Sequence, residues 1–418
     1  MTVRDPDRSQ TLVVPDMRLA PADERQTFSV TTIDDTAEFE ALRSEWDRLL
    51  SATEGGTVFQ SWEWAFSWWQ AFGHGKQLRV LAVRDSQSKL VALWPLYRFK
   101  ATCLGLRLSV LRLLGTGHGV SPDYMGCLTS PQGDSAAVSA LVGWLGENRR
   151  EWDVLRLNEI RADAPWAEQL TTESAQRGWP ARAVHRARCF YVELPDSWGA
   201  YCDLLPGHVR RSYRRRMRNL ERFDPHYFRW ENEEGLGGAI ARLGELHRGR
   251  WTERANGHSA FSTPGYIRFH ELLAPRVQKR GWLGLYCLSV HGEIVSMLYT
   301  FDHNRVVYAY QSGIDSAWKD FSVGTALRSF VLQDCIGRGA RELDFLKGEH
   351  GYKLECTNRV RSTVNLLVNN STLGGRAECL YRSAADLGRS AVRRALPGAV
   401  RQFARRARRS RRAGGLSY

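Results

Sequence analysis

The densest group of titratable side chains follows a short predicted strand, within the run DFLKGEHGYK. Ligand sites of α/β proteins lie at the carboxyl ends of strands, so we expect chemistry here. Asp344, Glu349 or His350 could take a proton from an attacking nucleophile. Tyr352 could protonate a departing thiolate, because a phenol is a weaker acid than a thiol. The alternative is a surface turn held by the two glycines of the run, with Lys353 in solvent.

A second candidate site is the loop that enters a predicted helix at 323–338. Small residues at a helix start leave backbone N–H groups free, and the helix dipole favours negative charge, so a pyrophosphate fits there. A glycine lets the ligand approach the backbone closely. The alternative is an ordinary helix with a serine N-cap. The predicted phosphate-binding residues are Lys319, Ser322, Val323, Gly324 and Thr325.

The elements that would position these motifs occur in two series of the same order. In the first half we expect strands and helices over 28–33, 34–50, 62–72, 78–84, 90–97, 106–114, 124–128, 135–148, 152–157, 164–177 and 183–194. In the second half we expect them over 237–251, 264–280, 283–290, 293–301, 305–312, 323–338, 341–345 and 362–369. The hairpins LRVLAVRDSQSKLVALWPLY and LGLYCLSVHGEIVSMLYTF agree in pattern and spacing, which indicates an internal duplication. Generic α/β patterning is the alternative interpretation.

The two halves differ at the loop before the long helix. In the first half this loop contains Pro131, which lacks an N–H, and Asp134, which would repel a phosphate. If only one unit binds a cofactor, we therefore expect it to be the second.

Bulk properties favour a two-domain protein kept in a reducing compartment. The chain has 418 residues, of which 43% are hydrophobic. Its eight cysteines form no CxxC pair and no metal-ligand cluster, so we expect small buried side chains and no metal. No apolar signal region and no run of about 18 apolar residues occurs, so we expect a cytoplasmic location.

The net charge of +14 is concentrated in two segments. Residues 208–222 hold seven arginines and one glutamate at spacings that predict an amphipathic helix. This helix could hold an acidic substrate or the acceptor stem of a tRNA, or be a solvated face. Residues 387–418 hold ten arginines and no acidic residue. With apolar positions about four residues apart, this tail is typical of a helix attracted to anionic lipid; a disordered basic tail is the alternative.

The ordered motifs resemble a known family. The run DFLKGEHGYKLECTNRVRSTVNLLV, with SVGTAL shortly before it, is similar to the bacterial CelD/BcsL-type acetyltransferases, named for association with cellulose biosynthesis. These belong to the GNAT (Gcn5-related N-acetyltransferase) superfamily. Further matching pieces are FQSWEWAFSWWQAF, WPLY, SPDYMG, HVRRSYRRRMRNLERF and LHRGRW. The resemblance covers about residues 28–370.

The resemblance implies an α/β fold with a mixed α+β sheet and tandem GNAT-like domains, related to Fem-type peptidyl transferases. It implies acyl-CoA at the loop 322–325, a backbone N–H of strand 305–312 at the thioester oxygen, and Asp344, Gly348, Tyr352 and Lys353 as motif residues. We divide the chain into a flexible leader (1–26), an N-terminal GNAT-like domain (27–195), a C-terminal GNAT acyltransferase domain (196–372) and a basic amphipathic tail (373–418).

The acceptor side is predicted from two groups of residues. His247, Arg250 and Trp251 recur at i, i+3 and i+4 on one helix face, and Trp251 could stack on a sugar ring. The alternative is a core tryptophan with polar neighbours at its edge. Asp123 and Tyr124 of the SPDYMG motif are the other candidates for substrate binding.

These observations predict an acyl-CoA-dependent acyltransferase, most simply an acetyltransferase, acting on a sugar hydroxyl or amine in polysaccharide or envelope biosynthesis. The expected partners are a small-molecule or glycan acceptor and, through the tail, an anionic membrane surface. Two alternatives stay open: aminoacyl-tRNA-dependent peptidyl transfer, the one case in which nucleic acid would bind, and a non-catalytic scaffold.

Overall fold

The computed structural model describes residues 28–131, 133–252 and 259–395. The predicted leader lies outside the described residues, as does the tail beyond residue 395. The strands are β1 Ser29–Ile33, β2 Gln77–Arg84, β3 Leu90–Cys103, β4 Leu106–Leu113, β5 Leu128–Thr129, β6 Val154–Arg161, β7 Ala181–Glu193, β8 His226–Arg229, β9 Leu283–Val290, β10 Glu293–His303, β11 Val306–Ile314, β12 Glu342–Lys347 and β13 Arg359–Asn369. They form one mixed sheet, and the predicted mixed α/β class is confirmed.

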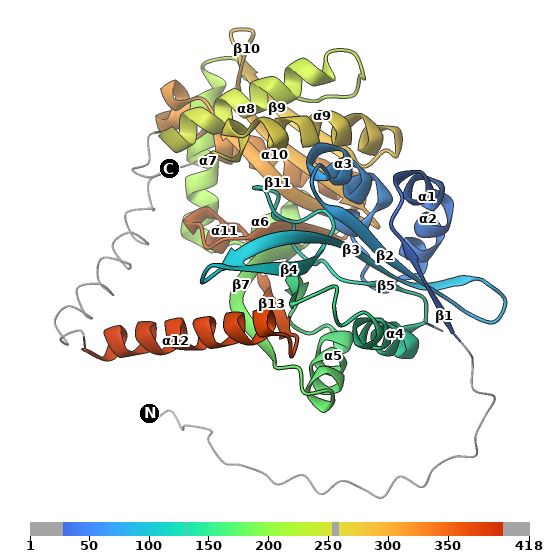
Figure 1. Ribbon diagram of the computed structural model, residues 1–418. Helices are drawn as coiled ribbons and strands as arrows, with labels where there is room; N and C mark the ends of the chain where they lie inside the picture. The colour runs from blue at the N-terminus through green and yellow to red at the C-terminus, as the bar shows by residue number, and fades with distance from the viewer. Residues whose placement is uncertain (1–27, 132, 253–258, 396–418) are drawn as a thin grey trace, which may run out of the picture.

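Helices cover this sheet along its length (Figure 1). They are α1 Thr36–Ala41, α2 Arg43–Ala52, α3 Trp62–Phe72, α4 Asp134–Glu147, α5 Pro165–Gln176, α6 Trp198–Leu204, α7 Gly207–Glu221, α8 Leu236–Thr252, α9 Pro264–Lys279, α10 Val323–Gly337, α11 Gly351–Cys356 and α12 Leu373–Ala395. The order helices, hairpin, strand, helix, strand occurs in both halves, as the sequence predicted. The structure adds elements to the second half that the sequence analysis missed, including the strand β8 before α8 and the short helix α11 between β12 and β13. None of the helices described is long and apolar enough to cross a membrane.

The strand predicted at 124–128 is wrong. Only Leu128–Thr129 is a strand, paired with β3, and Met125 makes a single bridge to Ile160. Tyr124 has a φ of 62°, in the left-handed region, which interrupts an extended chain. An alternating apolar pattern therefore does not become a strand where the backbone turns.

The two halves exchange their last strands. In the sheet order β4-β6-β13-β7-β12-β11, the final strand of the second half lies between two strands of the first. β13 pairs antiparallel with β6 and with β7, and β7 in turn pairs with β12. The sheet is therefore continuous across both repeats. At its centre the strands of the two repeats alternate, so neither repeat forms a separate sheet.

The core is shared as well. α3 has aromatic residues on all sides because it is buried all round, with Trp64 and Trp68 fully inside. Trp64 meets Phe269 of α9 at a ring-centroid distance of 5.0 Å, and Phe59 meets Tyr308 of β11 at 5.3 Å. Aromatic side chains of the first half therefore support the strand that carries the second half's cavity.

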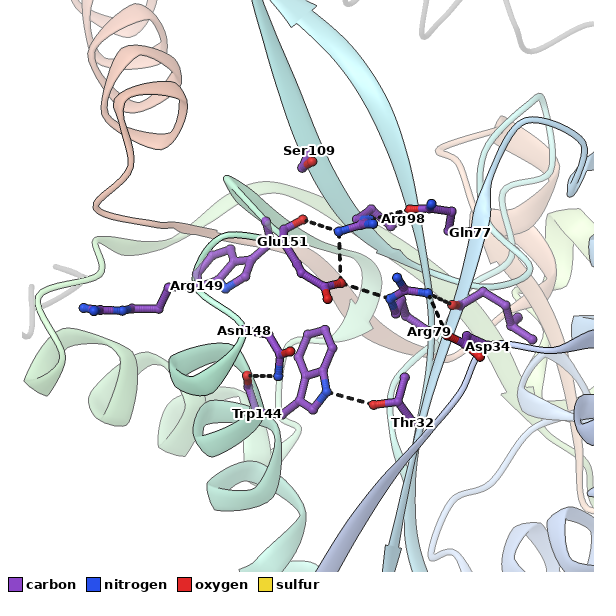
Figure 2. A network of polar contacts seen from close by, with 12 residues as sticks. Thr32, Asp34, Gln77, Arg79, Arg98, Ser109, Trp144, Asn148, Arg149 and Glu151 are labelled. Carbon is purple, nitrogen blue, oxygen red and sulfur yellow. Dashed lines mark hydrogen bonds and ion pairs between the residues drawn. The ribbon is translucent and has the colours of Figure 1, made fainter.

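Ion pairs in the first half join the β2–β3 hairpin to the turn before β6. Figure 2 shows Glu151, in the turn before β6, between Arg79 of β2 and Arg98 of β3, with N–O distances of 3.2 and 2.9 Å. Arg98 also donates to Gln77 at 2.7 Å. The side chains of Arg79, Arg98 and Glu151 are partly shielded from solvent, so these ion pairs hold the β2–β3 hairpin against the turn.

The exchange of strands predicts that the first half cannot fold alone. Residues 27–195 expressed by themselves leave β6 and β7 without the strand between them, so we expect aggregation or an unfolded chain. Co-expression with residues 196–418 should restore a soluble complex. Circular dichroism melting and gel filtration measure both; a cooperative melt of the isolated fragment would contradict the interlocked arrangement.

Candidate active site

The site begins where two parallel strands part. β11 and β12 pair from Val306–Glu342 to Tyr308–Asp344 and no further. β11 continues to Ile314 and β12 to Lys347, so a wedge opens between them. Beyond Tyr308 the edge of β11 that faces this wedge has no ladder partner, and a ligand chain can take its hydrogen bonds.

A bulge in β11 shapes the wedge further. β10 pairs Tyr299 with Gln311 and then Thr300 with Ala309, so Tyr310 is an extra residue without a partner in the ladder. Such a residue bends the strand and re-aims its backbone. This is the segment that the sequence predicted to offer an N–H to a thioester oxygen.

A cavity of about 500 Å³ fills the wedge. The second half contributes β10, β11, the start of α10, the end of β12 and α11. The first half contributes Gly119, Ser121 and Asp123, and α8 contributes His247. The size fits a small ligand, and the lining mixes apolar walls with a few convergent polar groups, as binding sites do.

The N-terminus of α10 forms one end of the cavity. Ser322 has a φ of 58° and its side chain makes no capping bond, so it is not the ordinary N-cap that we considered. Gly324 lines the cavity, and a side chain there would come within 2.5 Å of the Ile314 Cδ1 atom. Val323 and Thr325 are buried beside it, whereas Lys319 is exposed and outside the lining.

Arg328, one turn after Gly324 on α10, brings a positive charge to the cavity, which the exposed Lys319 does not. It lines the cavity, donates to Thr325 Oγ1 at 2.9 Å and stacks over the Tyr352 ring at 4.1 Å. Its Nε is buried without a hydrogen-bond partner. A guanidinium held beside a helix N-terminus suits a phosphate.

The buried side chain of Lys353 binds the backbone at the end of β12. Its Nζ donates to the carbonyl oxygens of Phe345, Leu346 and Lys347 at 2.6, 3.1 and 2.7 Å. Burial lowers the pKa of Lys353 to about 8, against the pull of nearby carboxylates. The interpretation of this lysine as a solvated turn residue is therefore wrong: it is buried and shapes the cavity floor.

Asp344 lies beneath the cavity rather than on its surface. It is fully buried, accepts from Tyr124 Oη at 2.7 Å and from the Leu346 N–H at 2.7 Å. Burial raises its pKa to about 7, while the Arg361 guanidinium, 3.9 Å away, opposes the rise. In this arrangement Asp344 and Tyr124 join the two halves under the site, and the structure does not bring Asp344 to the reacting end.

Asp123 is the carboxylate that does face the cavity. Its Oδ2 accepts from the Lys347 N–H at 3.0 Å, and its Oδ1 is buried without a hydrogen-bond partner. The Lys347 ammonium lies 3.6 Å from Oδ1 and 2.7 Å from Glu159 Oε1. Burial raises the pKa of Asp123 to about 6, with Lys347 opposing. An acceptor group in the cavity could donate to Oδ1, which has the ion pair with Lys347 but no hydrogen bond.

The other predicted residues are divided. His247 is buried, lines the cavity and shares a hydrogen bond of 2.8 Å with Ser259. The side chains of Arg250 and Trp251 lie outside the described residues. Tyr352 lines the cavity, whereas Glu349 is half exposed, is outside the lining and pairs with Arg188 at 3.8 Å.

Sequence reasoning missed Arg328, Lys347 and Arg361. Arg328 could have been found from its place one turn after Gly324 on a predicted helix. The other two depend on strand pairing across the halves: Arg361 lies on the exchanged strand β13, and Lys347 meets residues of the first half. No local pattern reveals such partners.

The corresponding wedge of the first half is closed by the chain itself. β4 and β6 pair from Val110–Val154 to Arg112–Arg156, after which residues 125–129 fill the gap. The Met125 N–H donates to Glu159 O at 2.9 Å, and Leu128 pairs with Leu93. The chain just before this segment carries Asp123 into the cavity of the second half.

Among the described residues no group of histidine, cysteine, aspartate or glutamate is placed to hold a metal ion.

Comparisons with known proteins identify a domain family in the second half and a similar fold over most of the chain. Residues 207–354 match the acetyltransferase (GNAT) domain family. No curated protein matches the chain at a significant level. The crystal structure of FemX is similar with a TM-score of 0.55 at 11% identity, over 80% of this chain and 96% of that one. A protein of unknown function from Bacteroides thetaiotaomicron has a TM-score of 0.51 at 10% identity, over 82% and 100%. A tandem GNAT protein from the clavulanic acid biosynthesis pathway has a TM-score of 0.45 at 10% identity, over 83% and 99%.

The domain match and the fold together confirm the broad expectation. The second half carries a GNAT domain, so the protein is an acyltransferase of this type. The structural likenesses show the fold alone. The narrower CelD/BcsL-type resemblance and the domain limits at 195 and 372 stay predictions.

The buried lysine gives a test of the cavity floor. Lys353→Met leaves three carbonyl oxygens without their donor, so we expect the free energy of unfolding to fall by about 3 kcal/mol. Lys319→Met, at an exposed lysine, should change it by less than about 0.5 kcal/mol. Urea unfolding followed by tryptophan fluorescence measures both, and equal stability of the two variants would show that Lys353 is not a structural donor.

Proposed function

We propose that this protein transfers an acyl group from acyl-CoA, most simply acetyl-CoA, to an amine or sugar hydroxyl of an envelope or polysaccharide precursor. The observation that carries the proposal is the open wedge between β11 and β12, with a helix N-terminus at one end and the Asp123 carboxylate at the other. The CelD/BcsL-type motifs support the acceptor class, and cytoplasmic action is the location that fits the sequence.

The residues present fit a CoA thioester. The unpaired edge of β11 offers hydrogen bonds to an extended amide-containing arm, and the α10 N-terminus with Arg328 offers positive charge to a pyrophosphate. When acyl-CoA is bound, the carbonyl carbon of its thioester is the electrophile. The backbone N–H groups near the Tyr310 bulge would stabilise negative charge on its oxygen.

Asp123 is the group that we assign to the acceptor. Its Oδ1, which has an ion pair with Lys347 but no hydrogen bond, holds the acceptor's O–H or N–H and takes the proton as the new bond to the acyl carbon forms and the C–S bond breaks. Tyr352, at the cavity wall, or solvent returns a proton to the thiolate. Lys347 keeps Asp123 ionised near neutral pH by lowering its pKa against the effect of burial.

Titration calorimetry with acetyl-CoA tests the cofactor site. Arg328→Gln removes a charge-assisted hydrogen bond to a phosphate, so we expect a Kd at least tenfold higher. Arg268→Gln, at an exposed arginine of α9, is the matched control and should bind as the wild type does.

Failure of every acyl-CoA to bind would favour the second candidate, aminoacyl-tRNA-dependent transfer. The specific observation for it is the outer face of α7, where Arg211, Arg214, Arg215 and Arg218 are exposed. Within the described chain these four form no ion pair, while Arg210 pairs with Asp203 at 2.6 Å. Binding of tRNA that weakens steeply with salt would mark this reading.

The acceptor role of Asp123 predicts a pH profile. Its carboxylate must be ionised to take a proton, so kcat/KM should fall tenfold per pH unit below about 6. Asp123→Asn should lower kcat at least a hundredfold with little change in acetyl-CoA affinity. Lys347→Met removes the cation that lowers the pKa of Asp123, so the acidic limb should move to higher pH. An acidic limb unchanged in Lys347→Met would remove Asp123 from this role.

A further inference from the structure

Helix α12 is attached to the body by its polar side. Glu378 is buried, bonds to Arg156 at 3.1 Å and accepts from Asn369 Nδ2 at 2.7 Å. Asn369 also donates to the Gly375 carbonyl oxygen at 3.1 Å. Arg382 pairs with Glu378 from the next turn of the helix. Polar contacts therefore fix the rotation of α12 against β13.

The opposite side of α12 is apolar and faces outward. Leu373, Leu380 and Tyr381 keep 84%, 71% and 51% of their surface exposed. Spacings of seven and eight residues place these side chains on one face of a helix. We call them the α12 apolar face. Glu378, two residues before Leu380, lies about 200° around the helix, which is why burying one exposes the other.

An amphipathic helix in a globular protein usually turns its apolar face to the core, and α12 does the reverse. It spans 23 residues, a length of about 35 Å, and extends away from the body (Figure 1). Its contacts are with β13, β4 and β3, beside its first turns. The sequence continues the apolar spacing at Leu387, Ala391 and Val392.

Charge decides what covers this face. From residue 387 to 418 the sequence holds ten arginines and no acidic residue. Two copies of this chain paired along α12 would bring these like charges together. An anionic lipid surface would neutralise them while it covers the apolar face, and arginine on the polar side of such a helix favours this surface.

We propose that the α12 apolar face lies in the headgroup region of an anionic membrane, with the helix axis in the plane of the surface. The contact is made by α12 itself, before the arginine-rich end of the chain. It is independent of the chemistry in the cavity and would hold the enzyme beside membrane-bound acceptors.

Vesicle flotation of the full-length protein tests this proposal. The probes are vesicles of phosphatidylcholine alone and of equal parts phosphatidylcholine and phosphatidylglycerol. The variant is Leu373→Glu with Leu380→Glu, which leaves every arginine in place. The matched control is Leu104→Glu with Leu106→Glu, at two leucines 68% and 45% exposed in the β3–β4 turn.

We expect the wild type and the control to float with phosphatidylglycerol vesicles and not with phosphatidylcholine alone. The α12 variant should bind at least tenfold more weakly, because charged side chains replace two leucines that would leave water at the vesicle surface. Equal flotation of the α12 variant would overturn the proposal and leave the arginine tail as the anchor. Equal binding to both vesicle types would contradict the proposal that the membrane surface must be anionic. A wild-type dimer in sedimentation without vesicles that the α12 variant dissociates would assign the face to a second copy instead.

Discussion

The parting of β11 and β12 is the constraint on which the rest of the site depends. Two parallel strands that stay paired leave no room for a ligand, and here pairing stops at Tyr308 and Asp344. Lys353 fixes the end of β12 by gathering three of its carbonyl groups, and the bulge at Tyr310 bends β11 away. The open edge, the helix N-terminus and the approach from the first half all meet in the space that results.

The first half contributes residues to the cavity of the second half. Its wedge is closed by residues 125–129, and the segment that closes it brings Asp123 and Tyr124 across to the second half. The exchange of β7 and β13 makes this reach possible, because it joins both repeats into one sheet. The first unit thus supports the second and contributes part of the lining of its cavity.

Buried charges occupy the junction and are tied to one another. Asp344 is balanced by Arg361 and Tyr124, and Asp123 is balanced by Lys347, while Lys353 lies between them. Breaking one partner of such a group costs more than the pair contributes, because the remaining charge stays buried. Asp344, predicted to be catalytic, holds the junction, whereas Asp123, predicted to bind substrate, lines the cavity; both are fully buried.

The sequence by itself determined the mixed α/β class, most of the repeated order and the helix start at 323, and it predicted chemistry in the 344–353 run and a cofactor in the second half. Each of these rests on local signals: apolar periodicity, glycine, and a proline that removes an N–H. Only the tertiary structure decided that Lys353 is buried, that Asp344 lies below the cavity and that Asp123 reaches into it. It also decided that α12 turns its apolar side outward, because Glu378 is drawn inward to Arg156 and Asn369. These outcomes depend on strand exchange and on partners more than 200 residues apart, as in the bond from Tyr124 to Asp344, and no local pattern encodes them.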